Sequence, residues 1–149
     1  MPLKIEWDES FSVGHALLDD QHKELLALLQ RAADCVEDDS PNGRALFHGV
    51  LNDVCAYTTS HFRTEETLLA QCHYPLLAEH KAEHFAFLEQ ITELTFAASQ
   101  GVTLKADLQR ALLRWLSQHI LEADRQYSHC LENAVPVGVS KSLPGDPRG

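Results

Sequence analysis

Seven side chains that can bind metal ions lie in four stretches of the chain that carry an apolar stripe: His22, His61, Glu65, His80, His84, His119 and Asp124. Two of them, His61 and Glu65, are four residues apart, and so are His80 and His84. Residues four apart share one face of an α-helix, so each pair can point into a common interior. Five imidazoles and two carboxylates are more than one metal ion needs. They are about what two adjacent transition-metal ions need when carboxylates bridge them, and the sequence predicts such a site.

In the fourth stretch, two carboxylates are candidates for the second anionic ligand. His119 and Asp124 are five residues apart, which is about 140° around an ideal helix at ~100° per residue. Asp124 is therefore expected to reach the site from the flank of its helix. From the spacing alone, either Glu122 or Asp124 could be this carboxylate ligand.

The elements that must position these side chains begin with two helices. The first is expected over about residues 19–38, with Asp19 as its N-cap. The second begins at Ser40-Pro41, a capping residue followed by proline at the first helical position.

Two further helices follow. Tyr74-Pro75 separates the second from the third, Gly101 ends the third, and Thr103 caps a fourth that runs to about residue 133. Connections of two to six residues make neighbouring helices antiparallel, so the fold class is all-α, an up-down-up-down antiparallel four-helix bundle. At ~1.5 Å rise per residue, this topology brings all seven side chains toward one end of the bundle.

Two segments lie outside the helices. Residues 1–17 show no sustained helical period and are predicted to form an extended N-terminal arm on a single domain of residues 1–133. Residues 134–149 hold three prolines and three glycines and are predicted to be a flexible, disordered C-terminal tail.

The composition is that of one ordinary globular domain. The 149 residues are 44% hydrophobic and 23% charged, and their net charge of −10 argues against nucleic acid or an anionic membrane as a partner. No apolar run approaches the roughly 20 residues of a membrane span. The first residues lack the layout of a signal peptide. We therefore expect a cytoplasmic protein, and the polar outer helix faces favour a monomer.

The four cysteines carry a weaker signal. Cys35, Cys55, Cys72 and Cys130 form no CxxC motif and share no regular spacing, so most of them are interpreted as small buried hydrophobes or idle thiols in a reducing compartment. Cys72 and Cys130 each stand beside a histidine, and the two pairs could meet to hold zinc. We consider that interpretation the weaker one.

A plain structural interpretation of the histidines is disfavoured. A single buried histidine is usually a satisfied polar side chain of the core. Five of them at one level with two carboxylates would cost many kcal/mol to bury without a cation. A metal site explains why all four stretches carry histidine or carboxylate side chains on their apolar faces.

The chain resembles the hemerythrin family, and its single-domain bacterial members closely, over nearly all of residues 5–132. The resemblance rests on a set of motifs in order and at matching spacing: Trp7-Asp8, Gly14, Leu18-Asp19-Asp20-Gln21-His22, His61-Phe62-Arg63-Thr64-Glu65-Glu66, Tyr74-Pro75, His80-Lys81-Ala82-Glu83-His84, Trp115, His119-Ile120 and Asp124. All seven ligand positions of the family are filled. The resemblance favours Asp124 over Glu122 as the fourth-helix carboxylate.

By this resemblance the cofactor is a non-heme pair of two iron ions. One iron takes three histidines, His80, His84 and His119. The other takes His22 and His61, and both share Glu65, Asp124 and an oxo or hydroxo bridge. The count gives six ligands to the first iron and five to the second, so the second keeps one position open for O2. The resemblance thus implies reversible O2 binding for transport, storage or sensing, by a binding protein that is not an enzyme.

The pocket around the open position should be dry and apolar. Its expected wall lies beside the ligands or one turn from them: Leu25, Phe62, Trp115, Leu116 and Ile120. Tyr127 and Trp7 are weaker candidates for closing its ends. Gln21, Asp19 and Glu66 are candidates for hydrogen-bond partners of the ligand imidazoles.

Two rival functions stay open. One is a di-iron enzyme that reduces peroxide, O2 or nitric oxide. The other is a sensor or partner-binding module that uses the tail, residues 134–149, as its contact surface.

Overall fold

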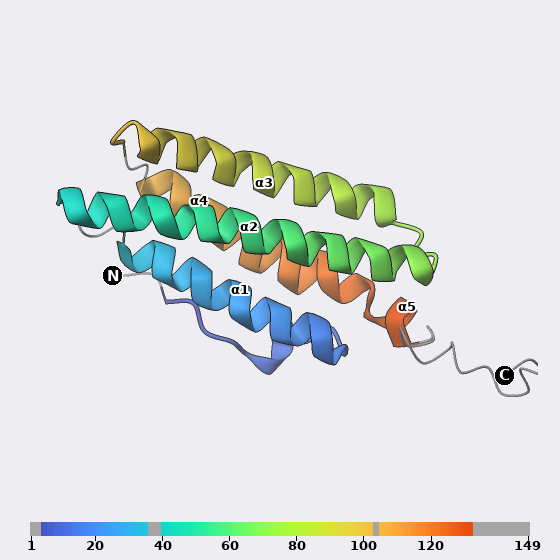
Figure 1. Cartoon of the computed structure of the whole chain (residues 1–149). Coiled ribbons are helices and arrows are strands. Elements are labelled where there is room, and N and C mark those ends of the chain that lie inside the picture. Colours follow the sequence, from blue (N-terminus) through green and yellow to red (C-terminus); the bar gives the residue numbers. More distant parts are fainter. Residues whose placement is uncertain (1–3, 36–39, 103–104, 133–149) are drawn as a thin grey trace, which may run out of the picture.

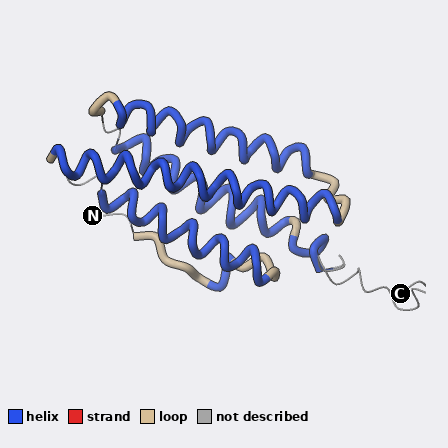
Figure 2. The backbone as a smooth tube through the Cα atoms, viewed as in Figure 1, coloured by secondary structure: helices blue, strands red, loops and turns tan. Residues whose placement is uncertain are grey.

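Long helices lie side by side in the computed structural model (Figure 1). The structure describes residues 4–35, 40–102 and 105–132, without the side chains of 116, 117 and 122. The elements in chain order are η1 (Glu9–Phe11), α1 (Ala16–Cys35), α2 (Pro41–Gln71), α3 (Leu77–Ser99), α4 (Lys105–Arg114), η2 (Trp115–Asp124) and α5 (Ser128–Glu132). Helices and loops alone make up this described part of the chain (Figure 2). The predicted all-α bundle is confirmed, with α4 and η2 together forming the fourth rod.

The arm before α1 is tied to the first turn of that helix. Helix α1 begins at Ala16, three residues earlier than expected, and Asp19 is not its N-cap. Its carboxylate instead accepts hydrogen bonds from the Val13 backbone N–H (2.9 Å) and the Ser12 hydroxyl (2.6 Å). Gly14 makes the intervening turn with a φ of +76°, which glycine adopts without a steric cost. The expected end of this helix at residue 38 lies outside the described residues.

The second and third helices begin and end where the local sequence indicates. The Ser40 hydroxyl accepts from the Gly43 N–H at 3.0 Å, and Pro41 is the first residue of α2. After α2, His73 takes a left-handed φ of 56° and the chain turns through Tyr74 into α3. Gly101, at φ +81°, turns the chain after α3. The expected cap at Thr103 lies outside the described residues, as does the tail.

The fourth rod differs from the single helix that was expected. After α4 the backbone changes to a π-helix, η2, over Trp115–Asp124, and a turn at Tyr127 separates it from the short helix α5. π-helical segments are rare and occur frequently at functional sites. Here the change begins four residues before His119 and ends at Asp124.

Two apolar clusters make up the core. The larger runs along the bundle between all four rods and includes Leu29, Leu51, Ile91 and Leu108. A smaller one covers the end of the bundle where α1 begins and α2 ends: Val13, Leu18, Leu69, Tyr74, Tyr127 and Leu131. This end is therefore closed to water by residues of the arm, the α2–α3 turn and α5. None of the described helices combines the length and apolar character that a membrane crossing requires.

A disulfide corrects the expectation for the cysteines. Cys72, just after α2, is bonded to Cys130 of α5, while Cys35 and Cys55 are free thiols. The sequence places the pair 58 residues apart, so only the tertiary fold reveals it. The two neighbouring histidines do not form a metal site with these sulfurs in the described structure. The bond fastens α5 to the end of α2.

Loss of this bond should destabilise the fold. Cross-linking a loop of 58 residues restricts the unfolded chain by about 4 kcal/mol in the chain-entropy model. We expect the double variant Cys72→Ala/Cys130→Ala to lose about 2–4 kcal/mol of unfolding free energy in urea. A strong reductant should destabilise the parent protein comparably and leave the double variant unaffected. Equal stability of parent and variant would show that the bond does not hold α5.

Candidate metal centre

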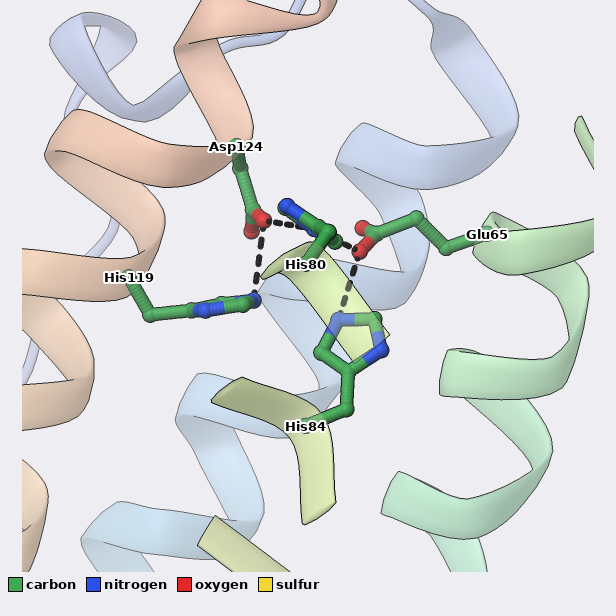
Figure 3. Close-up of side chains that lie close together, drawn as sticks. All are labelled: Glu65, His80, His84, His119 and Asp124. Carbon is green, nitrogen blue, oxygen red and sulfur yellow. Dashed lines mark hydrogen bonds and ion pairs between the residues drawn. The ribbon is translucent and has the colours of Figure 1, made fainter. Parts of the chain in front are cut away.

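All seven predicted side chains meet inside the bundle. His22 comes from α1, His61 and Glu65 from α2, His80 and His84 from α3, and the remaining two from η2. Each is at most 4% exposed. Figure 3 shows Glu65, the α3 pair and the η2 pair directed toward one point. The ligand atoms form two groups that share Glu65: a group of five, Glu65, His80, His84, His119 and Asp124, and a group of three, His22, His61 and Glu65.

Glu65 divides its two oxygens between these groups. Its Oε1 lies 2.8 Å from His80 Nε2 and 2.9 Å from His84 Nε2. Its Oε2 lies 3.4 Å from both His22 Nε2 and His61 Nε2. The Glu65 carboxylate thus lies between two clusters of imidazoles. We call His80, His84 and His119 the three-histidine side of the site, and His22 and His61 the two-histidine side.

Asp124 does the same from the opposite helix. Its Oδ1 lies 2.9 Å from the Nε2 atoms of both His80 and His119, and its Oδ2 lies 3.2 Å from His22 Nε2. Asp124 does reach the site, but the expectation that it does so from the flank of an α-helix is wrong, because this segment is a π-helix. A π-helix bonds each N–H to the carbonyl five residues earlier, so residues five apart lie above one another. The π-helical backbone of η2 therefore brings His119 and Asp124 to one face.

The donor set fits a pair of transition-metal ions. Around an octahedral ion with bonds of roughly 2.1 Å, adjacent ligand atoms are about 3.0 Å apart. The distances between carboxylate oxygens and imidazole Nε2 atoms are 2.8–3.4 Å. The Nε2 atoms of His22, His61 and His119 and both oxygens of Asp124 lack a well-aligned hydrogen bond among the described residues, although they are buried. Such atoms are stabilised by a cation, and imidazole with carboxylate suits iron.

The metal-free site holds protons in place of a cation. Burial opposes the charged form of His22 and of His80, but the neighbouring carboxylates of Asp124 and Glu65 outweigh it and raise the pKa of each to about 10. The pKa of His119 rises to about 8 against the same opposition, through the charge of Asp124. Burial alone would raise the pKa values of Glu65 and Asp124, yet the surrounding imidazoles lower both. Protonated histidines thus balance two buried anions.

Hydrogen bonds orient the ligand rings from behind. Gln21 Oε1 lies 2.8 Å from His61 Nδ1, and Glu66 Oε2 lies 2.7 Å from His84 Nδ1. When Nδ1 carries the proton and donates it to these oxygens, Nε2 presents its lone pair to the centre. Both were predicted as partners, whereas the third candidate, Asp19, holds the arm instead. Glu83, which was not predicted, lies 3.4 Å from His119 Nδ1.

Tyr127 makes a contact that sequence reasoning missed. Its hydroxyl donates a hydrogen bond of 2.7 Å to Glu65 Oε2, and its side chain is fully buried. Burial raises the pKa of Tyr127 well above its usual value, and the Glu65 charge adds to that shift. The phenol therefore keeps its proton and holds the Glu65 oxygen that faces His22 and His61. The turn after η2 creates this contact, and that turn has no signal in the helical periodicity.

Four of the predicted pocket residues are buried, and two of them stack on ligand rings. Leu25, Phe62, Trp115 and Ile120 are all buried. The Phe62 ring stacks on His84 with a centroid distance of 3.6 Å, and Trp115 stacks on His119 at 4.1 Å. The two aromatic rings therefore cover histidines of the three-histidine side. The side chain of Leu116 lies outside the described residues.

Comparisons with known proteins agree with this geometry. Residues 13–130 match the family model described as the hemerythrin HHE cation binding domain. The chain is 31% identical to a bacteriohemerythrin of Stenotrophomonas maltophilia over 82% of this chain and 78% of that protein. It is 33% identical to myohemerythrin-1 of Phascolopsis gouldii over 85% and 94% of the two chains. The crystal structure of a wild-type hemerythrin superposes with a TM-score of 0.77 and 27% identity, covering 87% of this chain and 98% of the other.

Metal uptake should release protons. In the metal-free protein the pKa values of His22 and His80 are about 10, so a metal ion must displace their protons at neutral pH. The same protons stabilise the metal-free fold below about pH 6.5, and that contribution is lost as the pH rises through about 10. We expect metal affinity to increase from about pH 6 to about pH 8. Titration with Zn²⁺ in a weakly buffered indicator solution measures the released protons. An affinity independent of pH would contradict the proton balance.

Removal of Glu65 should empty both sides of the site, because its oxygens face both groups. Glu65→Ala is expected to retain almost no metal. His119→Ala removes a ligand from the group of five alone and should retain about one ion per chain. Elemental analysis of the purified variants measures this, with the exposed Glu79→Ala on α3 as the matched control. Full retention of two ions by Glu65→Ala would refute a shared carboxylate.

Proposed function

The chain belongs to the hemerythrin family, and on that premise we propose that it binds O2 reversibly at a non-heme di-iron centre. Transport, storage or sensing of oxygen are the physiological uses such binding serves. The proposal combines the family membership with the geometry of the seven buried side chains.

One observation carries the proposal: each of two buried carboxylates faces both sides of the site. Glu65 directs Oε1 to His80 and His84 and Oε2 to His22 and His61. Asp124 divides its oxygens in the same way. A single ion has no use for this division, whereas two adjacent ions need bridging anions to reduce their mutual repulsion.

The two sides differ in the number of imidazoles. We propose that His80, His84 and His119 hold one iron, that His22 and His61 hold the other, and that both carboxylates bridge them. The second side is one protein ligand short, and this leaves room for a small external ligand there. A pair of ferrous ions bound there would supply the electrons for reversible O2 binding.

The balance of ligands favours binding over oxidative catalysis. Related di-iron bundle proteins use four carboxylates and two histidines, whereas this site has two carboxylates and five histidines. Fewer anions stabilise highly charged iron less, so this site should retain and return O2 rather than cleave it.

The buried surroundings serve the same end. Leu25 and Ile120 are fully buried, and the Phe62 and Trp115 rings cover histidines of the site. These side chains exclude the water that would promote loss of the electrons to O2. Tyr127, as a neutral donor to Glu65, fixes that carboxylate without supplying a proton readily, because its pKa is raised well above the usual value.

The iron-loaded protein should give a stable oxygenated spectrum. After reduction to the ferrous form under argon and mixing with O2, we expect a new visible absorption band that disappears again under argon over repeated cycles. Stopped-flow absorbance measures its formation and decay, and the zinc-loaded protein serves as the control because zinc does not change redox state.

An enzymatic function predicts a different result. Rapid conversion to the ferric form, together with sustained turnover of added peroxide or nitric oxide, would contradict reversible binding and favour a di-iron reductase.

A further inference from the structure

One hydroxyl in the core has no hydrogen-bond partner. The side chain of Thr58 on α2 is fully buried, at 0% exposure, and its Oγ1 makes no hydrogen bond to any described residue. Burial of an unpaired hydroxyl destabilises a protein, so such groups are rare and usually have a ligand or a function. Outside the seven predicted metal ligands, the described structure has one other buried, unpaired side-chain polar atom, Nε1 of Trp115.

Other helical threonines show that Thr58 is unusual. Five of them on α2 and α3 donate their hydroxyl to the backbone carbonyl four residues earlier: Thr59, Thr64, Thr67, Thr92 and Thr95. This local bond is the ordinary way for a helical threonine to satisfy its hydroxyl. Thr58 lacks it, so its hydroxyl is free for a partner in the interior.

The helical register places Thr58 beside the two-histidine side. It lies three residues before His61 and four before Phe62, on the same buried face of α2. The rings of His61 and His22 meet at a centroid distance of 4.7 Å across the antiparallel pair α1–α2. By the same antiparallel register, three residues further into each helix, Thr58 of α2 is expected opposite Leu25 of α1. This register, with its burial, assigns the free hydroxyl to the wall of the proposed O2 pocket.

A hydroxyl at this position suits O2 chemistry. O2 gains negative charge as it takes electrons from iron, and a neutral O–H can donate a hydrogen bond to it. A carboxylate there would repel that charge, and a protonated imidazole would supply a proton and promote release of the reduced product. The unpaired Trp115 N–H belongs to a ring stacked on His119, on the three-histidine side, so it is the less suitable donor.

We propose that Thr58 is a positioning residue for the ligand: its Oγ1–H donates the hydrogen bond that holds O2 on the His22/His61 side of an otherwise apolar pocket. The proposal rests on the proposed function, since it assigns a polar contact to the O2 that the site binds.

Three variants of the iron-loaded protein test the proposal. Thr58→Val removes the hydroxyl at nearly constant shape and should weaken O2 binding about 3- to 10-fold, mainly through faster dissociation. Thr58→Ser keeps a hydroxyl and should stay within about 2-fold of the parent. Thr59→Val, on the exposed side of the same helix, is the matched control and should bind as the parent does. Oxygen equilibrium curves and stopped-flow dissociation give both quantities.

Thermal unfolding of the O2-free, iron-loaded protein separates a ligand contact from a structural role. Because the hydroxyl has no protein partner, Thr58→Val should unfold at the same temperature as the parent or a few degrees higher. Weaker O2 binding with unreduced stability supports the proposal. A lower unfolding temperature would overturn it by showing that the hydroxyl stabilises the fold. Unchanged O2 affinity of Thr58→Val would also overturn it and leave the proposed function intact. Failure of the parent to bind O2 would overturn both.

Discussion

Two carboxylates, Glu65 and Asp124, are completely cut off from water at one end of this bundle. Two anions at such a position are costly unless positive charge surrounds them. Five imidazoles converge on them from all four rods, and in the metal-free protein raised pKa values keep His22 and His80 protonated. Metal ions in place of these protons satisfy the same requirement with greater charge. Hydrogen bonds from Gln21 and Glu66 orient two of the imidazoles that surround these carboxylates.

The fourth rod shows how the backbone adapts to this requirement. A regular α-helix would turn Asp124 away from His119, whereas the π-helix η2 places both toward the centre. The turn that follows directs the Tyr127 hydroxyl to Glu65, and the Cys72–Cys130 disulfide then fixes α5 against the end of α2. The π-helix at the site is thus followed directly by the contacts that close the end of the bundle. The ligand set and its enclosure are parts of one arrangement.

Helical periodicity, caps and breakers were sufficient to predict the all-α bundle, the start of α2 at Pro41 and the convergence of seven side chains, because these features are local in the sequence. The features that were missed depend on tertiary contacts. Asp19 looks like a cap, but its carboxylate binds the arm. The π-helix leaves the apolar pattern nearly unchanged, so His119 and Asp124 were expected on different faces. The disulfide joins cysteines that are distant in the sequence. The sequence also does not reveal that the Thr58 hydroxyl lacks a hydrogen bond to the backbone.

The central claim is that Glu65 and Asp124 are shared between two unequal metal positions. Anomalous diffraction at the iron edge from crystals of the iron-loaded protein tests it most directly. We expect two peaks of similar height. One should be bound by His80, His84 and His119, the other by His22 and His61, and an oxygen of each carboxylate should touch each peak. A single peak, or two peaks without a common carboxylate, would contradict it.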